Sequence, residues 1–215
     1  MKKQRYRILF SKTDQMRFTG HLDLILTWER VFRRAGIPLA YSEGFSPRPL
    51  LNMAAPLPLG FISTGEIGDF WLSEIIPIGD FKHLVDNALP PGLELQSVEE
   101  VSDLYGSKLP SQVTAARYRI SFLEDIPILE NKVNEILNTS SLIRERKGKS
   151  FDIRPLITEL ETIQATLRSG VDINMTLVNL PGATGRPDDV LDALNISARA
   201  SRICRTEIIL KTAGR

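Results

Sequence analysis

Cysteine is the residue this sequence most clearly lacks. The 215 residues contain one cysteine, Cys204, and two histidines. One thiol forms no internal disulfide and provides no cysteine set for a zinc ion or an iron–sulfur cluster. We therefore expect a reducing, cytoplasmic setting and no metal or other cofactor held by this chain.

Long apolar runs and glycine-rich nucleotide motifs are absent as well. No stretch reaches the roughly 18 apolar residues that a membrane helix needs, and no apolar run of a signal peptide follows the basic start of the chain. The sequence has no P-loop and no G-x-G-x-x-G motif. No G-x-S-x-G elbow frames a serine. We expect no membrane partner, and neither nucleotide binding by those motifs nor hydrolase chemistry has support.

Charge is segregated along the chain, although the net charge is only +1. Residues 1–50 carry ten basic and four acidic residues, which gives +6. Residues 51–104 carry one basic and nine acidic residues, which gives −8, and the remainder sums to +3. Local fields act over a Debye length of about 8 Å, so an anionic partner remains compatible with the small net charge. The alternative is that the basic and acidic surfaces of the first half pair with each other.

The first half predicts alternating strands and helices. Tyr6, Ile8 and Phe10 alternate with polar residues, as in a half-buried strand, and the two helices show apolar residues at helical spacing. The predicted elements are strand 5–12, helix 20–35, strands 50–54 and 65–74, helix 80–89 and strand 93–101. This order, β-α-β-β-α-β, is the ferredoxin-like split βαβ arrangement.

The second half repeats the order of elements with one strand too many. Its predicted elements are strand 116–123, helix 126–138, strands 142–146, 151–160 and 171–178, helix 187–194 and strand 202–210. We therefore predict an α+β protein of two ferredoxin-like domains in tandem, the second with an extra strand. The predicted domains are residues 1–104 and 115–215, joined by a linker at 105–114.

The most informative stretch is residues 16–49. Its helix ends at Gly36 and Pro38, which are typical stop signals, and Asp23 suits the first turn as a capping residue. His21 lies at the positive end of the helix dipole, which favours neutral imidazole. Neutral imidazole acts as a general base or accepts a hydrogen bond from a nucleic-acid hydroxyl. The alternative is a packed histidine that hydrogen-bonds a loop carbonyl.

A rigid loop follows this helix. Ser46 and Arg48 each precede a proline, which holds their backbone extended. The guanidinium of Arg48 is thus positioned to bind phosphate or carboxylate through two N–H groups. Phe45 beside it is suited to stack on a base. The alternative is a packed crossover loop, in which Phe45 fills a core and Arg48 pairs with Glu43 or Glu66.

A basic hairpin tip is predicted in the second half, within residues 144–149. A projecting basic tip suits a phosphate backbone, although such a run also serves simply as a solubilising turn. The full set of predicted RNA contacts is Arg17, Arg30, Arg34, Phe45, Arg48, Arg144, Arg146, Lys147 and Lys149.

Four motifs in the first half resemble a known family. They are F-S-K-T, R-F-x-G-H-L-D, E-R-x-x-R-R-A-G-I-P-L-A-Y-S-E-G-F-S-P-R-P and P-L-P-L-G, within residues 6–69. They resemble the radical-SAM-linked protein family, a domain of unknown function that is fused to, or encoded beside, a radical-SAM protein. The resemblance implies a radical-SAM partner, which would hold the iron–sulfur cluster and S-adenosylmethionine.

Three hypotheses for function follow. The first is an accessory protein of a radical-SAM partner that binds RNA or presents a substrate and has no catalytic activity of its own. The second is a metal-independent RNA-processing or RNA-modifying enzyme with His21 as the general base. The third is a protein–protein docking module only, in which the acidic segment 51–104 binds the partner.

Overall fold

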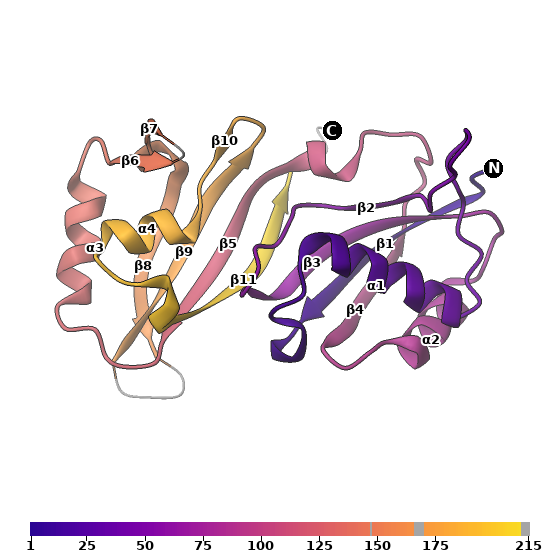
Figure 1. Cartoon of the computed structure of the whole chain (residues 1–215), viewed down its shortest axis with the longest axis horizontal. Coiled ribbons are helices and arrows are strands. Elements are labelled where there is room, and N and C mark those ends of the chain that lie inside the picture. The colour runs from indigo at the N-terminus through magenta and orange to yellow at the C-terminus, as the bar shows by residue number, and fades with distance from the viewer. Residues whose placement is uncertain (147, 166–169, 212–215) are drawn as a thin grey trace. The chain divides into compact units, whose positions relative to one another are not determined.

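A computed structural model describes residues 1–146, 148–165 and 170–211 of the chain (Figure 1). The chain divides into two compact units, Met1–Gln112 and Val113–Arg215. Both units contain helices and antiparallel strands, so the predicted α+β class is confirmed. The division falls inside the segment predicted as a linker, residues 105–114.

The first unit is a four-stranded antiparallel sheet with two helices. Its strands lie in the order β4-β1-β3-β2. The elements are β1 (Gln4–Lys12), α1 (His21–Arg34), β2 (Leu51–Met53), β3 (Ile62–Leu72), α2 (Ile78–Ala88) and β4 (Leu93–Glu100).

The core of this unit follows the periodicities of the sequence. On β1, the alternating residues Tyr6, Ile8 and Phe10 are fully buried. Trp28 of α1 lies against Phe10, with ring centroids 4.9 Å apart, and the apolar stripe of α2 joins the same cluster. Burial of each such side chain stabilises the fold by about 1.5–3 kcal/mol, so this cluster fixes α1 and α2 on one face of the sheet.

The other face of this sheet carries a buried ion-pair cluster. Asp69 on β3 is fully buried and accepts hydrogen bonds from Arg5 at 2.5 Å and from Arg7 at 2.7 Å. Hydrogen bonds to Asp69 raise the pKa of the Arg7 guanidinium above its ordinary value. Arg5 also donates to the Asp103 carbonyl, and Arg7 to the side chain of Gln112. Arg5 and Arg7 thus hold the segment after β4 against the first unit.

The second unit has the strand order β8-β9-β5-β11, again antiparallel. The short strand β10 pairs antiparallel with the last residues of β9. A separate hairpin pairs β6 with β7. The elements are β5 (Val113–Phe122), α3 (Leu129–Asn138), β6 (Ile143–Arg146), β7 (Lys149–Asp152), β8 (Ile157–Gln164), β9 (Val171–Leu180), β10 (Ala183–Thr184), α4 (Pro187–Ala193) and β11 (Ser201–Leu210).

The single strand predicted over residues 151–160 is wrong. The chain instead makes the end of β7, a 3₁₀ turn at Arg154–Leu156 and the start of β8. The Asp152 carboxylate accepts hydrogen bonds from the backbone N–H groups of Leu142 at 2.7 Å and Arg154 at 2.9 Å. These bonds lower the pKa of Asp152 and turn the chain, which apolar alternation alone does not reveal.

The predicted start of helix 126–138 is also wrong. The helix begins three residues later, at Leu129, because Ile128 takes the left-handed conformation with φ of 55°. A β-branched residue in that conformation is unusual, and the sequence gives no local sign of it.

Candidate binding surface

The loop at residues 41–49 is closed at its base. Tyr41 and Pro49 form an isolated β-bridge. The Ser42 N–H donates to the Arg48 carbonyl at 2.9 Å, and the Arg48 N–H donates to the Ser42 hydroxyl at 3.0 Å. Gly44 has φ of 118°, a conformation that glycine adopts without strain. The two ends of the loop are thus joined by its backbone and by the Ser42 side chain.

Phe45 lies at this tip, and its ring is fully exposed. The alternative that Phe45 fills a core is therefore wrong. Arg48 is also exposed, at the foot of the same loop. An aromatic ring and a guanidinium on a pinned loop match the two kinds of contact that single-stranded nucleic acid needs, stacking and phosphate binding.

A groove of about 430 Å³ lies beside the base of the loop. Arg33 on α1 and the half-exposed ring of Tyr41 line it, with Glu29 and Pro49 nearby. Sequence reasoning missed Arg33 and Tyr41 as site residues. The position of Tyr41 directly before the polar loop could have indicated a site residue. The exposure of the Tyr41 ring, however, depends on the bridge to Pro49.

The predicted arginines on α1 have different roles. Arg30 is exposed to solvent. Arg34 is exposed too, but its guanidinium donates to the Ala88 carbonyl at 2.6 Å, at the last residue of α2. Cations near a helix C-terminus satisfy its free carbonyls and its dipole, so Arg34 has a structural role in capping α2.

Arg17 also has a structural role. Its Nε donates to the Gly60 carbonyl at 2.7 Å, and the Gly60 N–H donates to the Arg17 carbonyl at 3.0 Å. Its guanidinium carbon lies 5.5 Å from the centre of the Phe18 ring. These contacts fix the residues before β3 against the turn before α1.

His21 is the first residue of α1 and is half-buried. The helix places it about 20 Å from Arg34, at 1.5 Å per residue, whereas the loop follows the opposite end of the helix. The structure therefore does not bring His21 to the centre of the loop site. Asp23 stays exposed in the first turn, where a carboxylate suits the helix dipole.

We expect the purified chain to turn over no RNA, and His21→Ala to change RNA affinity by less than about fivefold. The same substitution is expected to lower the free energy of unfolding by about 1 kcal/mol, because a half-buried side chain and its contacts are lost. His83→Ala, at an exposed histidine on α2, is the matched control. RNA cleavage by the wild-type chain that drops about 10²–10⁴-fold in His21→Ala would instead identify a general base.

The basic side chains of the β6–β7 hairpin differ in their surroundings. The side chain of Arg144 turns toward α4, and its Nε lies 3.3 Å from the Asp192 carboxylate. Lys149 is exposed. The side chain of Arg146 and the whole of Lys147 lie outside the described residues. Arg144 thus links the hairpin to α4, whereas the side chain of Lys149 points into solvent.

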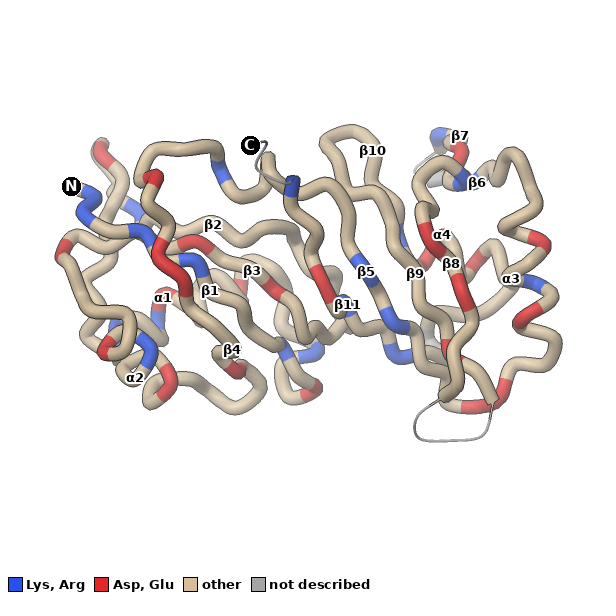
Figure 2. Tube along the Cα trace, turned by 180° about the vertical axis from the view of Figure 1, so that it is seen from behind, with Lys and Arg blue, Asp and Glu red and all other residues tan. Residues whose placement is uncertain are grey.

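The acidic segment 51–104 is partly used within the first unit. Asp69 pairs with two arginines, and Glu99 on β4 lies 3.9 Å from Arg7. Figure 2 shows the basic residues of β1 beside acidic residues of β3 and β4. The alternative of internal pairing therefore holds for this sheet face, whereas Arg48 of the loop and Arg30 and Arg33 of α1 stay exposed.

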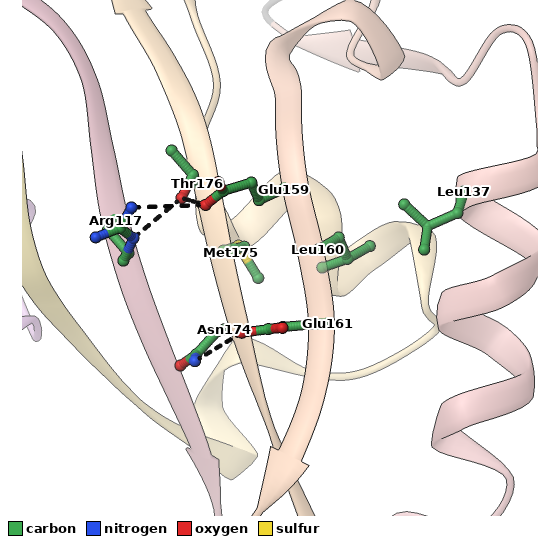
Figure 3. Close-up of a pocket in the computed structure, with 8 residues that line it drawn as sticks. All are labelled: Arg117, Leu137, Glu159, Leu160, Glu161, Asn174, Met175 and Thr176. Atoms are coloured by element: carbon green, nitrogen blue, oxygen red, sulfur yellow. Dashed lines mark hydrogen bonds and ion pairs between the residues drawn. The ribbon is translucent and has the colours of Figure 1, made fainter.

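A pocket of about 540 Å³ lies in the second unit, where no site was predicted (Figure 3). Arg117 on β5 lies 3.7 Å from Glu159 and also pairs with Glu207. The Thr176 hydroxyl donates to Glu159 at 2.6 Å, and the Asn174 amide donates to Glu161 at 3.1 Å. The polar groups here are engaged with one another, which is the pattern of a stabilised sheet surface.

Among the described residues, no three His, Cys, Asp or Glu side chains are grouped to hold a metal ion. In the same part of the chain, no helix is long and apolar enough to cross a bilayer.

A protein-family model matches most of the chain. The family described as an uncharacterized protein conserved in bacteria (DUF2344) matches residues 5–187. The chain belongs to this family. The match includes the whole first unit from Arg5, with the loop at 41–49, and most of the second unit. Among curated proteins, none matches the chain.

Proposed function

We propose that this chain is a non-catalytic accessory protein that binds single-stranded RNA through the loop at 41–49. The observation that supports this most is the fully exposed ring of Phe45 on a loop pinned by Ser42 and Arg48. Exposing a phenylalanine forgoes its hydrophobic stabilisation, and the pinned loop lowers the ordering cost of binding. Stacking by Phe45 and phosphate binding by Arg48 then act together.

The partner in this proposal is a radical-SAM protein, as the motifs in residues 6–69 imply. The partner supplies the iron–sulfur cluster and S-adenosylmethionine, because one cysteine does not ligate such a cluster. In this proposal both proteins work in the cytoplasm, and the chain presents its RNA to the chemistry of the partner.

We further propose that each unit is a ferredoxin-like domain. The first unit has the element order β-α-β-β-α-β and the antiparallel order β4-β1-β3-β2. The second unit has the equivalent order if the β6–β7 hairpin and β10 are taken as additions. Many functions use this fold, so it adds no weight to RNA binding by itself.

Salt dependence tests the RNA proposal. The logarithm of affinity for a short single-stranded RNA should fall with the logarithm of salt concentration by about 0.7 per phosphate contact. Arg48→Ala should reduce this slope by about 0.7, because one phosphate contact is lost. Fluorescence anisotropy across a salt series measures both slopes.

Arg186→Ala is the matched control, since Arg186 is an exposed arginine of the second unit. It should leave the slope unchanged. Absence of RNA binding at low salt, or equal slopes for wild type and Arg48→Ala, would favour the docking-only hypothesis.

A further inference from the structure

Four large apolar side chains are exposed around the start of α1. Phe18 is 76% exposed, Leu22 is 74% exposed, Leu59 is 64% exposed and Leu26 is 45% exposed. We refer to these four residues as the α1 patch. Single exposed apolar residues are ordinary on protein surfaces, but a cluster of large ones marks an interaction site.

The chain holds the α1 patch together. Leu22 and Leu26 are one helical turn apart on α1, so their side chains lie on one side of the helix. Phe18 precedes the helix by three residues, and its ring lies against Arg17. The two hydrogen bonds between Arg17 and Gly60 hold Leu59, which precedes Gly60, next to the segment that contains Phe18. The patch is therefore a fixed surface built from two segments of the first unit.

The other end of α1 is basic. Arg30 and Arg33 are exposed there, and residues 17–34 carry four arginines against Asp23 and Glu29, which gives +2. A second copy packed parallel to α1 would bring like charges together, which is unfavourable. An acidic partner would be attracted instead.

We propose that the α1 patch binds an amphipathic helix of a partner protein, apolar along one stripe and acidic at the end that lies over Arg30 and Arg33. A row of apolar side chains at four-residue spacing forms a ridge that packs into the groove of another helix. Recognition of this kind uses apolar anchors at i, i+4 and i+7 of the incoming helix. The apolar part of this site is distinct from the RNA-binding loop, because the α1 patch and the loop lie at opposite ends of α1.

A designed helix is the probe for this surface. We would use a stapled, fluorescein-labelled peptide of about 16 residues, long enough to follow α1 at 1.5 Å per residue. It carries leucines along one stripe and glutamates at one end, and a second peptide carries lysines in place of the glutamates. Anisotropy titrations of the full chain then give the affinity for each peptide.

The acidic peptide should bind more tightly than the lysine peptide. Leu22→Ser should weaken its binding about tenfold or more, because an apolar contact is lost. Leu123→Ser is the matched control, since Leu123 of the second unit is 76% exposed, and it should have no effect. Arg30→Glu should weaken binding of the acidic peptide and strengthen binding of the lysine peptide.

Several results would overturn the proposal. Equal affinity for both peptides, or equal loss in Leu22→Ser and Leu123→Ser, would mean that the contact is not specific. A dimer in sedimentation that Leu22→Ser disrupts would assign the patch to a second copy. Adsorption to phosphatidylglycerol vesicles without peptide binding would assign it to a membrane surface. RNA affinity measured on Leu22→Ser and Leu123→Ser shows separately whether the loop is intact.

Discussion

Asp69→Asn is expected to lower the free energy of unfolding by about 3 kcal/mol, the low end of the range for breaking a buried ion pair. Asp69 is fully buried and is the shared acceptor for two arginines. The substitution keeps the shape of the side chain, so it creates no cavity. It leaves the Arg5 side chain, which is 2% exposed, without its anion. The Arg7 side chain is 16% exposed, so water can partly solvate its charge.

Urea denaturation of both proteins measures this loss. Glu99→Gln is the control, because Glu99 is 66% exposed and lies 3.9 Å from the same Arg7. An exposed pair contributes about 0–1 kcal/mol, so this variant should be nearly as stable as the wild type. Equal stability of Asp69→Asn and wild type would mean that the arginines of β1 do not depend on the Asp69 charge.

Phe45→Ala is expected to weaken single-stranded RNA binding by about 5- to 150-fold, the equivalent of the 1–3 kcal/mol that one stacked base contributes. The stability of the fold should not change, because the ring of Phe45 is fully exposed and stabilises no core. Phe45→Trp should keep the affinity, since a larger ring stacks at least as well. Anisotropy with labelled RNA measures affinity, and thermal unfolding checks the fold.

Phe18→Ala supplies the matched aromatic control. Phe18 is 76% exposed and belongs to the α1 patch, at the other end of α1 from the loop. The Phe18→Ala variant should bind RNA as tightly as the wild type and lose affinity for the acidic helical peptide. If both phenylalanine variants lost RNA affinity equally, RNA binding would not be a property of the loop.

Much of the local structure of the first unit followed from its sequence. The alternation of Tyr6, Ile8 and Phe10 predicted the buried side of β1, and the stop signals Gly36 and Pro38 predicted the end of α1 within one residue. The prolines after Ser46 and Arg48 indicated a stiff loop. These features depend on side chains a few residues apart, so a local pattern is enough to predict them.

The second unit was harder to predict. The strand expected over residues 151–160 is broken because Asp152 binds the backbone of both Leu142 and Arg154. Helix α3 starts late because Ile128 takes a left-handed conformation. Hydrophobic periodicity does not reveal a turn that a carboxylate stabilises. It also does not reveal a strained residue before a helix.

The sequence by itself determined the α+β class, the core stripe of α1 and the presence of an arginine and a phenylalanine on a stiff loop. Only the tertiary structure decided which of these groups are available to a ligand. It exposed Phe45, assigned Arg34 to the end of α2 and placed His21 at the far end of α1 from the loop. The physical reason is that availability depends on partners distant in sequence, as Arg34 and Ala88 are, and only folding brings such partners together.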